Sequence, residues 1–201
     1  MKVQLAVAAT LAAIFLATPA FADAMVVIGD GPERMCYLSA KTGIDSQRGI
    51  DHCNMALENT ALILHDRAAT LVNRGVIEHK LGRNEAAMND YNDCLRLVPD
   101  QPDAFINRGV AWMTENKYDL ALADIEKGIA LGPSEPALAY FDRAIAFENL
   151  GRAVPEGNQR QAYLQKAYAD YQTALKEAPG FTAASNALAR FRVVPNRARA
   201  S

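Results

Sequence analysis

Six charged side chains recur at matched places along the chain, and their types and spacing suit ion pairing or anion binding. They are Arg74, Arg108 and Arg143, together with Asp90, Asp124 and Asp170. Each arginine precedes a small residue, and each aspartate precedes a tyrosine or an isoleucine. The planar guanidinium group can engage a carboxylate through two parallel hydrogen bonds. Repetition at matched positions favours internal ion pairs, and an anion-binding site formed by the arginines is the alternative.

These residues belong to a sequence pattern that occurs twice between Ala68 and Glu135, with a period of 34 residues. Asn73-Arg74-Gly75 recurs as Asn107-Arg108-Gly109, and Pro99 recurs as Pro133. Small residues stand where helices must approach closely, larger ones fill the space between them, and a proline closes each copy. Self-similarity at this period indicates repeated helix–turn–helix units.

The pattern resembles the tetratricopeptide repeat. The likeness is carried by the small-residue positions, by Phe105 four residues ahead of Gly109, and by the closing prolines. The sequence departs from the family at Arg74 and Arg108, where an apolar residue is usual, and at Glu78, which replaces an expected aromatic. The resemblance implies an all-α helical solenoid that binds proteins in a concave groove. The chain also resembles the small exported single-domain members of this family found in Gram-negative bacteria.

About four helix–turn–helix units and a capping helix are predicted, because the last unit of a solenoid needs a cover. The predicted parts are a signal peptide at 1–22, a leader segment at 23–31, a solenoid at 32–192 (an irregular repeat at 32–60, repeats at 68–101, 102–135 and 137–179, and a capping helix at 182–192), and a mobile tail at 193–201. In the third repeat the first helix is expected to end near Leu150. Pro155 and Gly157 then mark an insertion, which predicts a loop and an extended second helix.

The first 22 residues have the pattern of a cleavable secretory signal peptide. Lys2 precedes an apolar run from Leu5 to Leu16, and Ala20-Phe21-Ala22 offers a small-residue cleavage site. The run is shorter than the roughly 20 residues that a membrane-spanning helix needs, so we predict cleavage after Ala22 and a periplasmic or secreted protein. Loss of Lys2 would reduce the 21 basic side chains to 20 against 23 acidic ones, a net charge of −3. That balance argues against a nucleic-acid binder.

The three cysteines have different predicted roles. Cys36 and Cys53 lie on the two expected helices of the irregular repeat, close to the places that arginine and aspartate occupy in the other units. Such a pair can persist as a disulfide in an oxidising compartment, and we interpret it as a covalent replacement for the ion pair. Cys94 falls at a small-residue packing position and is expected to be a buried free thiol. A metal site at His52 and Cys53 would lack a second pair of ligands with metal spacing, so no metal or other cofactor is expected.

Signatures of catalysis are missing from the sequence, which contains no HExxH, no GxSxG and no glycine-rich phosphate loop. His52, His65 and His79 have no recurring partners, and solvated or capping roles are expected for them. The sequence therefore predicts a protein that is not an enzyme, with an enzyme or metal-binding protein as the remote alternative.

The first helices of successive units line the concave face of tetratricopeptide repeats, so the resemblance implies which residues would meet a partner. They are Val72, Asn73, Val76, Ile106, Asn107, Val110, Phe141, Asp142 and Ile145. Asparagine is both a donor and an acceptor and can pair with the backbone of any peptide, so an extended protein or peptide segment is the predicted partner. The lysines that hold a C-terminal carboxylate in the chaperone-binding members of the family are absent from the matching places. The alternatives are a groove filled by the protein's own leader or capping helix, and a structural subunit of a homo-oligomer or envelope complex.

Overall fold

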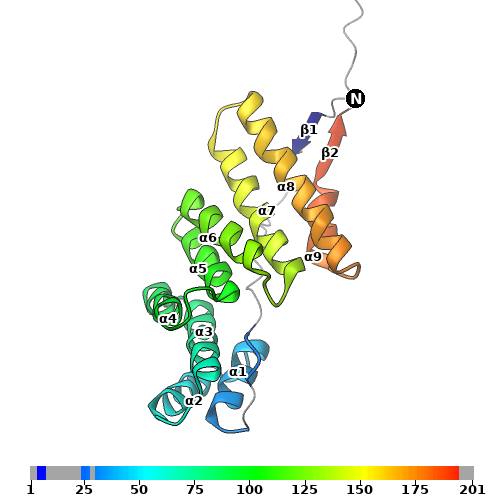
Figure 1. Cartoon of the computed structure of the whole chain (residues 1–201). Coiled ribbons are helices and arrows are strands. Elements are labelled where there is room, and N and C mark those ends of the chain that lie inside the picture. The colour runs from blue at the N-terminus through cyan, green and yellow to red at the C-terminus, as the bar shows by residue number, and fades with distance from the viewer. Residues whose placement is uncertain (1–3, 8–23, 28–29, 195–201) are drawn as a thin grey trace, which may run out of the picture.

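The computed structural model describes residues 4–7, 24–27 and 30–194, and within these ranges the chain is a curved stack of helices (Figure 1). The helices are α1 Pro32–Thr42, α2 Ser46–Glu58, α3 Leu64–Lys80, α4 Asn84–Leu97, α5 Pro102–Thr114, α6 Tyr118–Leu131, α7 Pro136–Ala153, α8 Asn158–Glu177 and α9 Thr182–Ala189. Two short strands, β1 Gln4–Val7 and β2 Phe191–Val194, pair antiparallel beside α8. The helical solenoid predicted from the sequence is confirmed.

Successive helices pack as antiparallel pairs, and the pairs stack along the solenoid. The pairs are α1 with α2, α3 with α4, α5 with α6 and α7 with α8, while α9 packs on α8. The first helices also contact one another in series, from α1 to α3, α5 and α7. These four helices therefore line the inner, concave side of the stack.

Local signals in the sequence set where several helices begin and end. Pro32, Pro102 and Pro136 occupy the first turns of α1, α5 and α7, where a fixed φ is favourable and no N–H is needed. Gly43 ends α1 with φ 69° and Gly132 ends α6 with φ 83°. Glycine adopts this left-handed conformation without strain.

The two helices of each regular unit approach closely at a glycine. A Cβ atom at Gly75 would lie 2.5 Å from Cε1 of Tyr91, and one at Gly109 would lie 2.6 Å from Cγ1 of Ile125. Real Cβ atoms do not come this close to another side chain, so any larger residue would push the helices apart. The small residues of the repeated pattern therefore set the spacing between the helices of a unit.

Each recurring arginine forms a two-bond ion pair with the aspartate of its own unit, as predicted. Arg74 bonds Asp90 at 3.0 and 2.6 Å, Arg108 bonds Asp124 at 2.7 and 2.8 Å, and Arg143 bonds Asp170 at 2.7 and 2.8 Å. The arginine side chains are 21–25% exposed and the aspartates 6–12%. All three ion pairs are thus partly withdrawn from water, which strengthens the interaction between the charges.

Two of these arginines also bond the second helix of the preceding unit. Arg74 Nη1 donates to Asn54 Oδ1, and Arg108 Nη1 donates to Asn92 Oδ1, both at 2.7 Å. The sequence analysis missed these asparagines, although they hold the same place in consecutive second helices. Each arginine therefore connects the two helices of its own unit to the unit before it.

In the third unit a carboxylate stands in the place of the bridging asparagine. The hydrogen bond with Asp170, together with the negative charge of Glu126, raises the pKa of Arg143. Arg143 also lies over the ring of Tyr140, with its central carbon 5.3 Å from the ring centroid. The same arginine position is thus used in all three units with different neighbours.

The cysteine pair replaces a different contact from the one predicted. Cys36 and Cys53 lie at disulfide distance across α1 and α2, and both are fully buried. In the register of the repeats, Cys53 stands at the place of Tyr91 and Cys36 at the place of Gly75. The pair therefore takes the place of a packed glycine–aromatic contact, one residue beyond the ion pair in each helix. The interpretation as a replacement for the ion pair is corrected accordingly.

The C-terminal part of the solenoid differs from the prediction at three boundaries. Helix α7 continues to Ala153 instead of ending near Leu150, so the insertion lengthens both helices of the third unit and leaves only a short loop. Helix α9 ends at Ala189 instead of 192, and the chain then continues as β2. That strand takes up the start of the predicted tail, and residues 195–201 lie outside the described part of the chain.

A buried carboxylate joins the cap to the last unit. Glu148 on α7 is 2% exposed and accepts a hydrogen bond from Tyr171 Oη on α8 at 2.8 Å. Arg190, directly after α9, donates to the same oxygen at 3.1 Å, and Arg152 pairs with the other oxygen. The sequence analysis missed this cluster because no acid stands at the matching place in the two regular repeats.

Removal of one carboxylate from the ion-pair series should destabilise the fold. We expect Asp124→Ala to lower the free energy of unfolding by about 2–4 kcal/mol, because Arg108 would keep its partly buried charge without its partner. Asp100→Ala, at an exposed loop position, should change it by less than about 0.5 kcal/mol. Urea denaturation measures both. The double change Arg108→Ala with Asp124→Ala should recover part of the loss, whereas equally small effects of Asp124→Ala and Asp100→Ala would mean a surface contact only.

Candidate functional site

The residues predicted to meet a partner lie on α3, α5 and α7, whose inner faces form the candidate groove. All nine are buried, with exposed fractions from 0 to 3%. Val72 and Val76 pack in the hydrophobic cluster that is built mainly by α1–α4, whereas Val110 and Ile145 pack in the cluster that is built mainly by α5–α9. Asp142 is also fully buried, on α7. None of the nine is therefore an open surface residue in the folded chain.

Two of the nine side chains point toward the second helix of their own unit, which corrects their placement in the groove. Ile106 packs on α6, where a Cβ atom at Gly128 would lie 2.6 Å from Ile106 Cδ1. The ring of Phe141 contacts the rings of Tyr171 and Phe181, with centroids 5.5 and 4.9 Å apart. Both residues therefore belong to the core. Side chains one position apart on a helix point about 100° apart, so residues next to each other in the sequence do not face the same side.

The groove at α3 is occupied by an extended segment of the same chain, residues 24–27. Met25 is 7% exposed and Val27 is 3% exposed, whereas Val26 between them is 64% exposed. This alternation is expected of an extended chain that lies with one side on an apolar surface. Met25 and Val27 pack in the same cluster as Val72 and Val76.

Asn73 holds the backbone of this segment. Its Nδ2 atom donates to the carbonyl oxygen of Met25 at 2.8 Å, and the asparagine itself is fully buried. Asn107, one repeat further on, instead donates to the carbonyl of Asp103 in its own helix at 2.9 Å. The two amides are therefore not equivalent, and within the described residues the contact to an extended backbone lies at Asn73.

His79 extends the inner face of α3 beyond Val76, at helical spacing from Asn73. It is 7% exposed, which corrects the expectation of a solvated or capping role. Burial lowers the pKa of His79 to about 4, so its imidazole is neutral near pH 7. The other two histidines differ: His65 is half exposed and pairs with Asp66 at 2.9 Å, and His52 has a buried Nδ1 atom without a partner in the described part of the chain.

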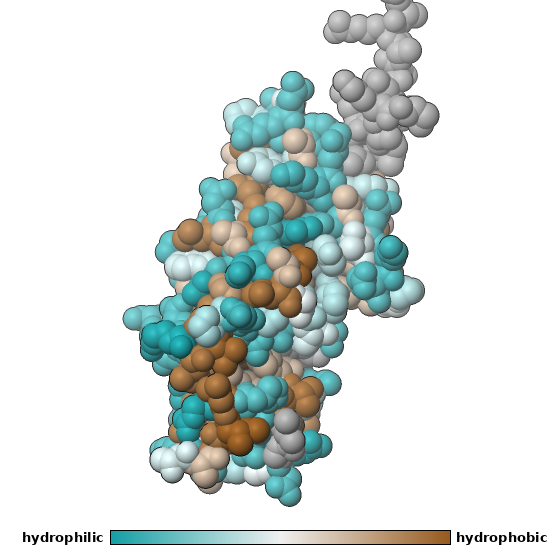
Figure 2. Space-filling model, in the orientation of Figure 1, coloured by the Kyte–Doolittle hydropathy of each residue, from teal (hydrophilic) through white to brown (hydrophobic). Residues whose placement is uncertain are grey.

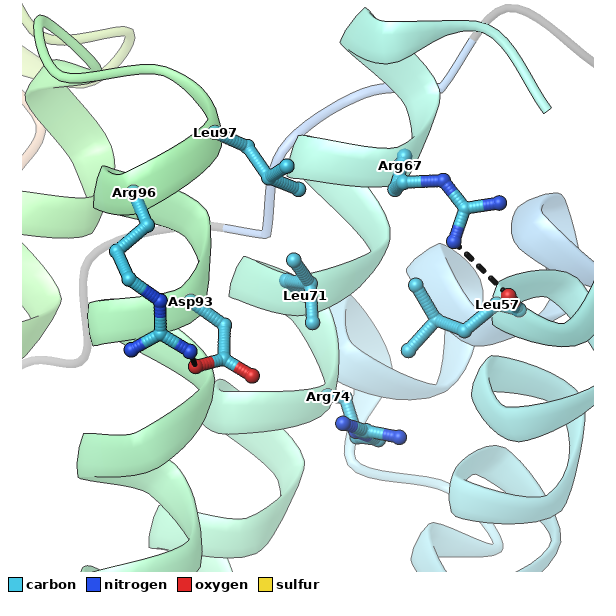
Figure 3. Close-up of a pocket in the computed structure, with 7 residues that line it drawn as sticks. All are labelled: Leu57, Arg67, Leu71, Arg74, Asp93, Arg96 and Leu97. Atoms are coloured by element: carbon cyan, nitrogen blue, oxygen red, sulfur yellow. Dashed lines mark hydrogen bonds and ion pairs between the residues drawn. The ribbon is translucent and has the colours of Figure 1, made fainter. Parts of the chain in front are cut away.

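A second concavity lies where α2, α3 and α4 meet. Figure 2 shows apolar side chains gathered over these helices, and Figure 3 shows the pocket itself. Its lining residues are Leu57, Arg67, Leu71, Arg74, Asp93, Arg96 and Leu97.

The guanidinium groups of this pocket are already engaged within the chain. Arg67 donates to the carbonyls of Leu57 and Asn59 at 2.9 and 2.6 Å, where it neutralises the C-terminal end of α2. Arg74 is held in the ion-pair series, and Arg96 pairs with Asp93. The pocket is thus explained by structural contacts and is the weaker candidate.

Other kinds of site find little support in the described residues. No cluster of His, Cys, Asp or Glu side chains there is suited to holding a metal ion. A search of the same residues finds no helix whose length and hydrophobicity would allow it to cross a membrane.

Comparison with known proteins places the first regular repeat in a family. Residues 68–101 match the sequence profile of the tetratricopeptide repeat. Over 120 residues the chain is 27% identical to human Tetratricopeptide repeat protein 6, and the match covers 60% of this chain but 23% of that protein.

Solved structures share the fold. MamA from Desulfovibrio magneticus RS-1 superposes with a TM-score of 0.55 and 17% identity, covering 81% of this chain and 84% of that one. The second tetratricopeptide domain of human RPAP3, solved in complex with an HSP70 peptide, gives a TM-score of 0.52 and 25% identity over 64% of this chain and 97% of that one. Fold and repeat together define the class, a helical solenoid. Within the chain, residues 68–101 match the tetratricopeptide repeat, and the fold is that of tetratricopeptide-repeat solenoids.

The buried histidine makes stability depend on pH. Because the pKa of His79 is about 4 in the folded protein and about 6.5 in an unfolded chain, the unfolded state binds the proton first as pH falls. Stability should therefore decrease between about pH 6.5 and pH 4, by about 2–3 kcal/mol in total from this group. Urea denaturation at pH 7, 5.5 and 4 should show that His79→Gln removes this part of the slope. His65→Gln is the exposed control, and an unchanged slope for His79→Gln would contradict the assignment.

Proposed function

We propose that this protein is a binding scaffold that holds an extended segment of a partner protein or peptide in its concave groove. The observation that carries the proposal is the hydrogen bond from Asn73 to the carbonyl of Met25 within an apolar wall. A side-chain amide that bonds a main-chain group recognises any extended peptide whose side chains fit beside it. The groove at α3 thus has the chemistry of a peptide site, with part of its own chain in place.

The likeness to peptide-binding solenoids supports the same proposal. Two tetratricopeptide domains of RPAP3 have been solved with HSP90 and HSP70 peptides, and both are 25% identical to this chain. By this analogy the partner is a protein segment. Because function resides in sites and not in folds, the partner of this chain must be argued from its own groove.

We also propose that the protein is exported and works in the periplasm or outside the cell. The support is the signal-peptide pattern of residues 1–22 and the pair Cys36 and Cys53 at disulfide distance. A disulfide would persist in an oxidising compartment and not in the reducing cytosol. Cys94 would remain a thiol, because burial raises its pKa to about 12 and keeps it protonated.

A structural subunit of a homo-oligomer or envelope complex is the second candidate. The observation that favours it is the occupied groove at α3, since a groove filled by its own chain needs no free partner. Light scattering at several protein concentrations separates the two. A mass that stays at one chain supports the scaffold, and a fixed higher mass supports the subunit.

The proposed export makes a prediction about thiols. Protein recovered from the periplasm and denatured without reductant should react with one equivalent of maleimide per chain, at Cys94. After reduction it should react with three equivalents. Three reactive thiols before reduction would contradict the oxidised pair, and protein made in a reducing cytosol is the control.

Binding should depend on Asn73 more than on Asn107. Peptides selected from a random display library on the wild-type protein provide the probes, and their affinities are measured by calorimetry. Asn73→Ala should weaken binding by about 1–3 kcal/mol, because a buried backbone carbonyl would lose its donor. Asn107→Ala should have a smaller effect, since Asn107 bonds its own helix. If Asn73→Ala folds and binds the selected peptides as the wild type does, also when Val27→Asp removes residues 24–27 from the groove, the groove at α3 is not the working surface.

A further inference from the structure

Residues 24–27 lie in the groove as a peptide ligand would. The segment has no helical structure, is buried on one side through Met25 and Val27, and is bonded through its backbone. Its solvent-facing residue, Val26, is 64% exposed although it is apolar. The contacts therefore depend on the extended shape and on small to medium apolar side chains, and not on charge.

The fit between Asn73 and the segment is incomplete. Its Nδ2 atom bonds Met25, but its Oδ1 atom is buried and has no hydrogen-bond partner in the described part of the chain. A buried acceptor without a donor is unfavourable, and an extended peptide offers a backbone N–H next to each carbonyl. A peptide in a slightly different register could use both atoms of the amide. The segment therefore leaves half of the hydrogen-bonding capacity of the Asn73 amide unused.

The first unit has contacts of its own that do not involve the segment. Helix α1 begins at Pro32, after a stretch that contains Gly29 and Gly31. Glu33 accepts a hydrogen bond from the Gly31 amide at 3.1 Å, which fixes the start of the helix. The pair of Cys36 with Cys53 then holds α1 to α2. Residues ahead of Gly31 are therefore joined to a firmly held helix by a short connection.

We propose that residues 24–27 act as a built-in competitor, which partner peptides displace from the groove at α3. This inference rests on the proposed function and adds the partner's chemistry and its regulation. The partner is an extended peptide with uncharged side chains at alternate positions, bound through those side chains and through its backbone. Because the competitor is tethered beside its site, its effective concentration is high. The apparent affinity for a partner therefore equals the intrinsic affinity multiplied by the fraction of grooves that stand empty.

The test uses the full exported chain and a fluorescein-labelled peptide of residues 24–29 with blocked ends. Val27→Asp places a charge at a position that is 3% exposed, so the tethered segment should leave the groove. The labelled peptide should then bind about tenfold more tightly than to the wild type. Val26→Asp places the same charge at a position that is 64% exposed and should leave the affinity unchanged. Adding Asn73→Ala to Val27→Asp should weaken binding again.

Each outcome separates this inference from the proposed function. Equal affinities of wild type and Val27→Asp would overturn the competitor and leave the peptide-binding scaffold intact. Failure of the labelled peptide to bind Val27→Asp, when library-selected peptides do bind, would have the same meaning. Failure of both kinds of peptide would overturn the scaffold itself. If Val27→Asp is unfolded by circular dichroism, Val27→Ser is the milder test, and unfolding of both would show that the segment is an indispensable part of the fold.

Discussion

The guanidinium group that precedes the small residue on α3, α5 and α7 is the contact on which the other features of the solenoid depend. Its donors lie in one rigid plane, so an arginine that bonds an aspartate on one side and an asparagine on the other fixes three helices at once. Arg108 does this with Asp124 and Asn92. Because the same arrangement recurs at Arg74, successive units are joined in the same way, and the apolar side chains fill the space that this polar frame defines.

The frame also explains why a backbone-binding amide can exist inside the concave face. Asn73 and Arg74 are neighbours, so on a helix their side chains point about 100° apart. With Arg74 held toward α4 by Asp90, Asn73 must point toward the inner side of the stack. A buried asparagine with an unused oxygen would destabilise a helix that was free to rotate. The ion pair of Arg74 with Asp90, together with the packing of α3, keeps the amide directed toward the extended chain.

The sequence was sufficient wherever the chain repeats itself. The period predicted the helix pairs, the close approach at Gly75 and all the ion pairs, because each was supported by a second copy. The misassigned features are those that the repeat period does not specify. The connection within the irregular repeat differs in length, so the cysteine pair was placed at the ion pair instead of at the glycine–aromatic contact. Ile106 belongs to the core because its helix is turned so that this side chain faces α6. The burial of His79 depends on neighbours that the repeat pattern does not specify.

The terminal unit shows how stability and binding are linked in this fold. At the places of arginine and aspartate it carries Met35 and His52, which cannot form the ion pair, and among the described residues no helix pair precedes it. The cysteine pair holds its two helices together, and residues 24–27 cover apolar surface shared by Ala40 of α1 and Val76 of α3. The segment that completes this end of the core is therefore the one that fills the groove. A change that binds it more tightly would stabilise the first unit and reduce access to Asn73, so the incomplete bonding at Asn73 favours an exchangeable segment over a permanent one.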